Sequence, residues 1–249
     1  MLPYYNHGGI KIYHGDCLEV LPELGLESLG VGAVVTDPPY GIAHVSNAGG
    51  NAPWKRTRIA GDQDVSVRDA ALDMLCAYPA LVFGTWKTPP PKHAHAALIW
   101  DKGAASGMGD LSVPWKPSWE MVFVIGHGFR GRRDEGVLKG LTGLTWFSKG
   151  RAHPHEKPVR LMVALLVKCP RGLILDPFMG SGTTLAAAKQ TGRPAVGVEL
   201  DERWCEAAAR RLEQEVLDFT PDAPETTEQE TLPLTGVTLC AARIMTTAK

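Results

Sequence analysis

Four consecutive residues, Asp37, Pro38, Pro39 and Tyr40, have the types and order that suit chemistry on a nucleobase, and they follow the apolar run GAVVT. Two adjacent prolines hold the backbone extended and offer carbonyl acceptors, while Asp37 adds a carboxylate and Tyr40 an aromatic face. Hydrogen bonds from an exocyclic amine to Asp37 and to the Pro38 carbonyl would make the amine nitrogen more nucleophilic. The alternative is a proline turn after a strand, with Tyr40 as a packing residue.

A glycine-rich segment, PFMGSGTT, follows a second apolar run, LILD. Gly180 and Gly182 allow the backbone to approach a ligand closely before the chain turns into a helix. Thr183 stands where a triphosphate-binding loop has lysine, so we expect a ligand with few phosphates or none. Glu199 is near the end of the next apolar run, where a dinucleotide-binding fold has the acid that bonds a ribose. Taken alone, these residues fit an adenosine-containing cofactor or an ordinary strand-to-helix turn equally well.

Apolar runs of strand length alternate with helical patterns along the chain, which is typical of a parallel sheet covered by helices. Strands are expected to end or lie in residues 11–16, 32–36, 80–84, 96–100 and 120–126. Helices are expected at 17–24, 69–78 and 158–169, and residues 172–216 read as strand, turn, helix, strand and helix. The pattern predicts an α/β fold with a mostly parallel sheet and helices on both faces. Ligands bind beyond the carboxyl ends of the strands in such folds, which is where both chemical motifs lie.

The combination of DPPY, DPFMGSGTT and the segment HPHEKP at residues 153–158 resembles the amino-group DNA methyltransferases of the permuted β type. The resemblance covers residues 9 to 215, and the catalytic motif precedes the cofactor motif, as it does in that family. It implies a Rossmann-like, circularly permuted methyltransferase fold and S-adenosylmethionine as the cofactor. It also implies methyl transfer to adenine N6 or cytosine N4 of double-stranded DNA, with the base swung out of the duplex.

The resemblance assigns roles to individual residues. Asp37, Pro38, Pro39 and Tyr40 would be catalytic. The predicted cofactor site comprises Asp16, Lys157, Asp176, Phe178, Gly180, Ser181, Gly182, Thr183 and Glu199. The family's HPTQKP stands here as HPHEKP, so His155 and Glu156 replace Thr and Gln, and no role is carried over to those two positions. Lys157 is expected to bond the cofactor carboxylate, the alternative being a solvated lysine at a helix start.

Charge is distributed unevenly along the chain, although the net charge is only −1. Two glycine-rich stretches without periodicity, 41–60 and 127–151, are basic and are expected to be loops that contact DNA phosphates. The predicted DNA-binding residues are Lys55, Arg56, Arg58, Arg130, Arg132 and Arg133. We expect a catalytic domain at 1–215 with a target-recognition segment at 127–152, followed by an acidic, disordered tail at 216–249.

Several classes of protein are disfavoured by composition. No apolar run approaches the roughly 18 residues of a membrane span, and the N-terminus lacks the pattern of a secretory signal, so a cytoplasmic location without membrane contact is expected. The five cysteines form no CxxC pair or zinc-type spacing, and no metal is expected. A monomer and a homodimer both remain open.

The sequence favours adenine N6 as the methylated atom, because family members that act on cytosine N4 more often carry serine where this chain has Asp37. Cytosine N4 is the first alternative. A methyltransferase acting on RNA or protein is less favoured, since protein-modifying enzymes carry NPPY. A catalytically inactive DNA-binding relative is the alternative from another class. Covalent catalysis by cysteine is disfavoured, because Cys169 precedes Pro170 in the wrong order and is far from DPPY.

Overall fold

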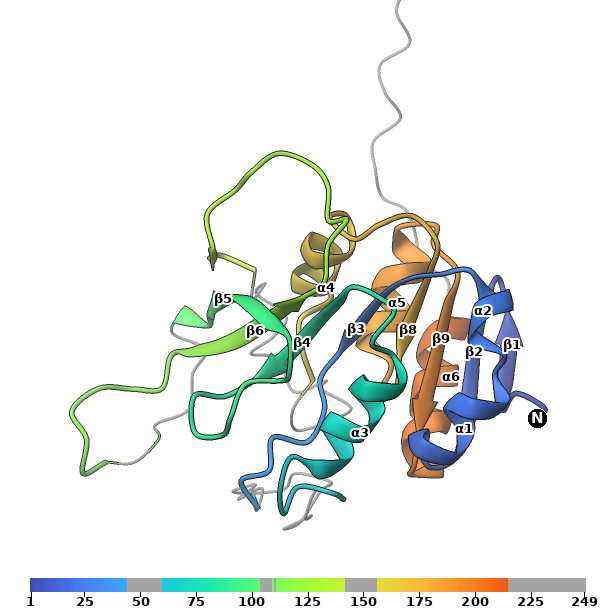
Figure 1. Cartoon of the computed structure of the whole chain (residues 1–249), viewed down its shortest axis with the longest axis horizontal. Coiled ribbons are helices and arrows are strands. Elements are labelled where there is room, and N and C mark those ends of the chain that lie inside the picture. The colour runs from blue at the N-terminus through green and yellow to red at the C-terminus, as the bar shows by residue number, and fades with distance from the viewer. Residues whose placement is uncertain (44–59, 104–108, 110, 142–155, 215–249) are drawn as a thin grey trace, which may run out of the picture. The chain divides into compact units, whose positions relative to one another are not determined.

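The computed structural model describes residues 1–43, 60–103, 109, 111–141 and 156–214 (Figure 1). The strands are β1 Tyr5–His7, β2 Ile10–His14, β3 Val31–Thr36, β4 Ala80–Gly84, β5 Ala94–Asp101, β6 Trp119–Ile125, β7 Val137–Leu138, β8 Leu173–Asp176 and β9 Ala195–Glu199. The helices are α1 Cys17–Glu23, α2 Leu26–Leu29, α3 Ser66–Met74, α4 Val159–Leu166, α5 Thr183–Gln190 and α6 Glu202–Glu213. Residues 1–215 form one compact unit by themselves, and the predicted tail, 216–249, lies outside the described residues.

Within the described residues, the strands form one sheet in the order β1-β2-β9-β8-β3-β4-β6-β5-β7. Strands β2, β9, β8, β3 and β4 are parallel to their neighbours in that order. Strand β6 runs antiparallel to both β4 and β5. The expected mostly parallel sheet is therefore confirmed, and the reversed β6 brings its first residues to the edge where β4 ends.

Side chains alternate between the two faces of the central strands, and each face is covered by helices. Ala33 and Val35 of β3 belong to a core that includes residues of α4, α5 and α6. Val34 points to the other face, into a core with residues of α1 and α3. This alternation is the period-two pattern of a strand buried on both sides, and it explains why the run VGAVV is apolar throughout. Helices on both faces were predicted, and the structure confirms them.

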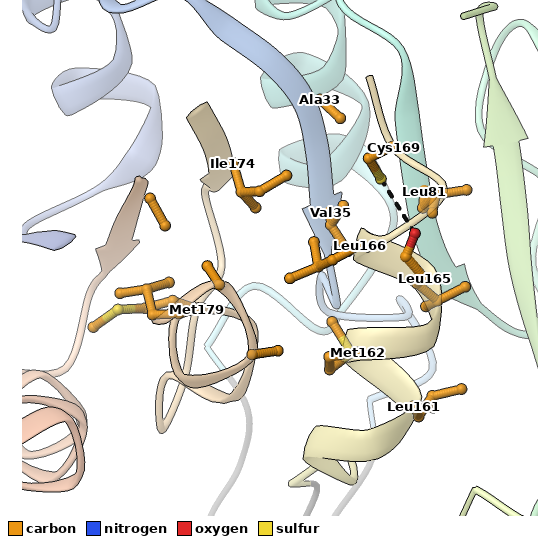
Figure 2. Close-up of a cluster of buried hydrophobic side chains, with 14 of the residues drawn as sticks. Ala33, Val35, Leu81, Leu161, Met162, Leu165, Leu166, Cys169, Ile174 and Met179 are labelled. Carbon is orange, nitrogen blue, oxygen red and sulfur yellow. Dashed lines mark hydrogen bonds between the residues drawn. The ribbon is translucent and has the colours of Figure 1, made fainter. Parts of the chain in front are cut away.

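Helix α4 shows how the sequence specifies packing on one of these faces. Leu161, Met162, Leu165 and Leu166 are at most 3% exposed. They occupy adjacent positions on successive turns and so form one apolar stripe, which faces the sheet beside Val35 and Leu81 (Figure 2). Burying each such side chain contributes about 1.5 to 3 kcal/mol. The segment immediately before α4, which contains Lys157, is therefore tied to the sheet.

Several elements and boundaries differ from the expectations. The edge strand β1 was missed; it pairs with β2 across Gly8 and Gly9, whose φ angles of 56° and 79° form a hairpin turn, and the Gly-Gly pair was its signal. The short helix α2 was also missed. Helix α3 begins at Ser66 rather than 69, because the Asp64 carboxylate accepts the Ser66 N–H at 2.8 Å. The stretch 127–141 is not purely a loop, since β7 pairs with β5.

Gly182 at the start of α5 permits a close contact between helices. Its φ is +76°, and a Cβ added there would lie 2.8 Å from the Cβ of Ala208 in α6. The left-handed backbone and the contact with Ala208 both exclude a larger residue at this position.

We expect Gly182→Ala to destabilise the protein more than Gly192→Ala. Both glycines have positive φ, +76° and +64°, but an added Cβ at Gly192 meets no atom within 4 Å. Gly192→Ala should cost only the left-handed backbone energy of about 1 to 2 kcal/mol. Gly182→Ala should cost roughly 1 to 3 kcal/mol more through overpacking against Ala208. Urea unfolding of both variants measures the difference, and equal losses would contradict the steric explanation.

Candidate active site

The DPPY motif follows β3 and the glycine-rich motif follows β8, and these two neighbouring strands lie at the topological switch point of the sheet. From β8 the chain proceeds to β9 on one side, whereas from β3 it proceeds to β4 on the other (Figure 1). The two strands are parallel neighbours, with Val34 paired to Leu175. The loops that follow them therefore leave the same edge of the sheet in opposite directions, which opens the crevice where α/β folds bind ligands.

A buried hydrogen bond joins the two motifs directly. The Thr36 hydroxyl donates to Asp176 Oδ1 at 2.7 Å, and the Phe178 N–H donates to the same oxygen at 3.1 Å. Burial raises the pKa of Asp176 from its usual 3.8 to about 6, an effect partly offset by hydrogen bonds from Thr184 and Thr36. Asp176 therefore fixes the start of the glycine-rich turn against the end of β3.

The segment Asp37–Tyr40 is held by contacts within itself and with a second loop. The Tyr40 hydroxyl donates to Asp37 Oδ1 at 2.8 Å. The Gly41 N–H donates to Asp62 Oδ1 at 2.7 Å, and Asp62 is only 2% exposed. Gly41 has a φ of +71°, and an added Cβ would lie 2.6 Å from the Asp64 carbonyl carbon, so only glycine fits there. Asp62 and Gly41 thus support the candidate catalytic loop, although the sequence analysis did not select them.

The glycine-rich turn is supported by Glu199 at the end of β9. Glu199 Oε2 accepts the Gly180 N–H at 3.0 Å, and Oε1 accepts the Asp201 N–H at 2.8 Å. Burial raises the pKa of Glu199, and the Asp201 and Gly180 N–H groups oppose that rise. Asp16 lies close by, because the adjacent Gly15 N–H donates to the Glu199 carbonyl at 2.9 Å. Asp16 itself caps α1 by accepting the Leu18 N–H at 2.8 Å.

One pocket connects the candidate catalytic loop with the glycine-rich turn. Its lining is Asp37, Glu156, Lys157, Met162, Asp176, Phe178, Met179, Gly180, Ser181, Thr183 and Thr184. Predicted residues from both motifs therefore face a common space, which sequence spacing alone could not establish. Of the remaining predicted residues, Asp16 and Glu199 lie at the same sheet edge, Pro38 is buried, and Gly182 packs against α6.

The placement of Lys157 rules out one of the two sequence expectations. It is only 8% exposed, so the alternative of a solvated lysine is wrong. Its Nζ lies 2.6 Å from Asp37 Oδ2 and 3.2 Å from Glu120 Oε2, and it also lies 4.9 Å from the centre of the Phe83 ring. Burial lowers the pKa of Lys157, but Asp37 and Glu120 outweigh burial and raise it. The ammonium thus lines the pocket while it pairs with Asp37 of the candidate catalytic loop, and the expected bond to a cofactor carboxylate stays a prediction.

The changed position Glu156 has a compensating partner. Arg211 Nη1 of α6 lies 2.8 Å from Glu156 Oε1 and donates to Thr183 Oγ1 at 3.2 Å. Arg211 thereby links the segment before α4 to the start of α5. The negative charge of Glu156, which stands where the family has a neutral glutamine, is thus matched by the Arg211 guanidinium. Arg211 was not predicted from the sequence because 55 positions separate it from Glu156.

The basic stretch that begins after β6 lies at the opposite edge of the sheet from the candidate site. Because β6 is antiparallel to β4, its last residue, Ile125, pairs with Ala80 at the start of β4. The Arg130 N–H donates to the Lys168 carbonyl, and Lys168 Nζ donates to the Arg132 carbonyl; Lys168 lies just beyond the end of α4. Arg130, Arg132 and Arg133 are exposed there. Lys55, Arg56 and Arg58 lie outside the described residues.

Among the described residues, no group of three or more His, Cys, Asp or Glu side chains is arranged to hold a metal ion. In the same part of the chain, no helix is long and apolar enough to cross a membrane.

The doubly wound sheet, with both motifs at its point of reversal, has the fold of S-adenosylmethionine-dependent methyltransferases. M1.HpyAVI, solved in complex with S-adenosylmethionine, matches with a TM-score of 0.59 at 20% identity over 82% of this chain and 100% of that one. PvuII DNA methyltransferase, described as cytosine-N4-specific, matches with a TM-score of 0.58 at 17% identity over 85% of this chain and 89% of that one. At these identities the matches establish the fold.

Sequence comparisons establish the family. The N6/N4 methyltransferase model, described as DNA methylase, matches residues 112–210. The putative methylase YubD of Escherichia coli (strain K12) is 30% identical over 217 residues, covering 81% of this chain and 89% of that protein. Type II methyltransferase M.ScaI of Streptomyces caespitosus is 26% identical over 267 residues, covering 86% and 84%. The chain belongs to the N6/N4 DNA methylase family.

The shifted pKa of Asp176 predicts a pH dependence of stability. Because that pKa rises from 3.8 to about 6 on folding, the folded protein binds this proton more tightly than the unfolded chain does. Its contribution to stability is therefore complete below about pH 4 and is lost as the pH rises through about 6. Asparagine can accept both hydrogen bonds made to Oδ1 and does not titrate.

We therefore expect Asp176→Asn to gain stability relative to wild type between about pH 4 and 6.5, by on the order of 1 to 3 kcal/mol. Urea unfolding at several pH values measures this difference for the two proteins. A constant difference across that range would contradict the assignment of the raised pKa to Asp176.

Proposed function

We propose that this chain transfers a methyl group from S-adenosylmethionine to N6 of adenine in double-stranded DNA. One observation carries the proposal: the Thr36–Asp176 hydrogen bond sets the Asp37 loop and the Gly180 turn around one pocket. An acceptor suited to an amine therefore lies beside a turn suited to an adenosine-containing cofactor.

The residues at the turn fit that cofactor. An added Cβ at Gly180 would meet no atom within 4 Å, so the turn is open on that side and a ligand can approach its backbone. Glu199 and Asp16 supply carboxylates for ribose hydroxyls and for the adenine region. Ser181, Thr183, Phe178 and Asp176 would lie beside the methionine part. S-adenosylmethionine supplies an electrophilic methyl group when it is bound.

Asp37 would orient the amine that receives the methyl group. A carboxylate offers about four lone-pair sites, and the Tyr40 hydroxyl and Lys157 Nζ use one on each oxygen. Each oxygen thus keeps acceptor capacity for an amine N–H, and the Pro38 carbonyl is the second proposed acceptor. Fixed acceptors in a partly dry site position the amine without reorganisation during the reaction.

Tyr40 combines two tasks in this scheme. Its hydroxyl holds Asp37, while its ring would stack on a base that has left the duplex, since the target nitrogen cannot be reached inside the stack. Burial raises the pKa of Tyr40 well above its usual value, and the neighbouring Asp37 and Glu120 raise it further, so the hydroxyl keeps its proton and remains a donor.

Adenine is favoured over cytosine because residue 37 is Asp, whereas cytosine-N4 members of the family more often carry serine there. Cytosine N4 remains the alternative, since the fold is shared with a cytosine-N4-specific enzyme. The cytoplasmic location and the oligomeric state stay predictions.

We expect Asp37→Ala to lower methyl transfer about a hundredfold or more, equivalent to about 3 kcal/mol of barrier, while S-adenosylhomocysteine affinity changes little. Asp73→Ala, which alters an exposed carboxylate of α3, is the control and should retain full activity. Tritiated methyl transfer to genomic DNA, followed by hydrolysis and chromatography, measures rate and product together. Label in N6-methyladenine supports the proposal, label in N4-methylcytosine supports the alternative, and full activity of Asp37→Ala would remove the assigned role.

The placement of the arginines alters the expectation for phosphate contacts. Lys87 follows β4 and Lys116 precedes β6, so both lie toward the edge that carries the candidate site, and both are exposed. Arg132 and Arg133 lie at the opposite edge. We therefore propose Lys87 and Lys116 as phosphate contacts in addition to the predicted basic residues.

Removing one lysine–phosphate interaction lowers the slope of log affinity against log salt by about 0.9. Lys87→Gln/Lys116→Gln should therefore flatten the slope by up to about 2, and Arg132→Gln/Arg133→Gln should change it less. Fluorescence anisotropy at several salt concentrations compares the two double variants directly. A larger change in the arginine variant would restore residues 130–133 as the principal phosphate-binding segment.

A further inference from the structure

Glu120 lies at the centre of a group of largely buried charges around the candidate catalytic loop, and it was not among the residues predicted from the sequence. Its Oε2 accepts from the Tyr40 hydroxyl at 3.2 Å and lies 3.2 Å from Lys157 Nζ. Its other oxygen, Oε1, lies 3.1 Å from Lys102 Nζ. Side-chain exposures of 23% for Glu120, 15% for Lys102 and 9% for Lys157 show that the group is largely shielded from water.

The reversed direction of β6 explains how Glu120 reaches this position. Residue 120 is the second residue of β6, which pairs antiparallel with β4, so it lies at the edge where β4 ends. Trp100, the penultimate residue of β5, pairs with Glu120, which brings the following Lys102 alongside. Lys157 lies in the segment immediately before α4. Glu120 of β6 thus links Lys102, which follows β5, and Lys157, which precedes α4, to the loop that carries Asp37.

The charges in this group balance. Two carboxylates, Asp37 and Glu120, face two ammonium groups, Lys157 and Lys102. Burial alone would raise the pKa of Glu120, but Lys157 and Lys102 outweigh burial and lower it to about 2, so Glu120 is ionised at neutral pH. Removing one member of a buried set leaves an uncompensated charge, which is costly in a poorly solvated site.

Lys157 is shared between the two carboxylates, and this sharing bears on Asp37. An ammonium paired with Asp37 alone would take up more of the accepting capacity of that carboxylate. Glu120 interacts with the same ammonium group, so part of the hydrogen-bonding capacity of Lys157 is directed to Glu120 instead of Asp37. Glu120 Oε2 also lies 3.2 Å from the Tyr40 hydroxyl, so the single proton of that hydroxyl is shared between Asp37 Oδ1, at 2.8 Å, and Glu120, which places the hydroxyl between the two carboxylates.

We propose that Glu120 is a positioning residue for methyl transfer, which holds Lys157 and the Tyr40 hydroxyl so that Asp37 keeps the orientation and capacity to accept the amine. The inference rests on the proposed function. Glu120 itself would touch neither the base nor the cofactor.

The test is a double-mutant cycle between Glu120→Gln and Tyr40→Phe, with steady-state methyl transfer to DNA as the readout. Glutamine keeps the size of the side chain and removes its charge, while phenylalanine keeps the ring and removes the hydroxyl. We expect Glu120→Gln to lower kcat by roughly 10- to 100-fold, a loss that falls within the coupling energies found between residues in contact. The KM for S-adenosylmethionine, and S-adenosylhomocysteine affinity by calorimetry, should stay within about threefold of wild type.

The double variant should be about as slow as the slower single variant, because both changes disrupt the same arrangement around Asp37. Asp73→Asn, the same chemical change at an exposed ion pair with Lys92, should behave as wild type. If Glu120→Gln melts below the assay temperature, the cycle is run with Glu120→Asp, which keeps the charge but withdraws the carboxylate from Tyr40.

Multiplicative losses in the double variant, wild-type kcat in Glu120→Gln, or a loss confined to cofactor affinity would each overturn the role of Glu120. Absence of methyl transfer by the wild type on any DNA would overturn the proposed function and the inference together. An active wild type with a multiplicative cycle would overturn the inference alone.

Discussion

The buried hydrogen bond between Thr36 and Asp176 is the contact on which the site depends. It spans 140 positions of sequence and joins the ends of two adjacent parallel strands, β3 and β8. Both partners are nearly inaccessible to water, so an unpaired Asp176 would be costly in that environment. The candidate catalytic loop and the glycine-rich turn therefore have one relative position that satisfies both partners, and the permuted order of the motifs along the chain does not alter it.

Around that contact, two largely buried charges, Lys157 and Glu156, are each balanced by partners from other elements. Lys157 is matched by Asp37 and Glu120, and Glu156, which departs from the family pattern, is matched by Arg211 of α6. Such pairs add little net stability compared with apolar packing, because desolvation opposes the attraction. Their effect is to restrict geometry, since each charge is satisfied in few arrangements. The pocket is thus defined by electrostatic requirements as much as by the shape of the sheet.

Much of the fold and most of the pocket lining could be predicted from the sequence, because the relevant signals are local. The apolar run before Asp37 and the glycines at 180 and 182 indicate strand ends and a binding turn within a few residues. Glu120, Asp62 and Arg211 carry no such signal, since their importance arises from pairings across the sheet. The arginines at 130–133 show the converse: their charge was evident, but the direction of β6, which places them at the far edge, is a property of strand pairing.

The position of β8 in the chain has a consequence for how the molecule assembles during synthesis. Strand β3 emerges from the ribosome early, yet β8, which covers one of its two edges, is translated about 140 residues later. Until then, the apolar β3 presents an unpaired edge, which is a site for wrong pairing. Contacts so distant in sequence also slow the closing step, because a long loop must be ordered first. The arrangement that brings the two motifs together thus makes completion of the sheet a late event, and nascent chains would benefit from protection of β3 until the C-terminal third is made.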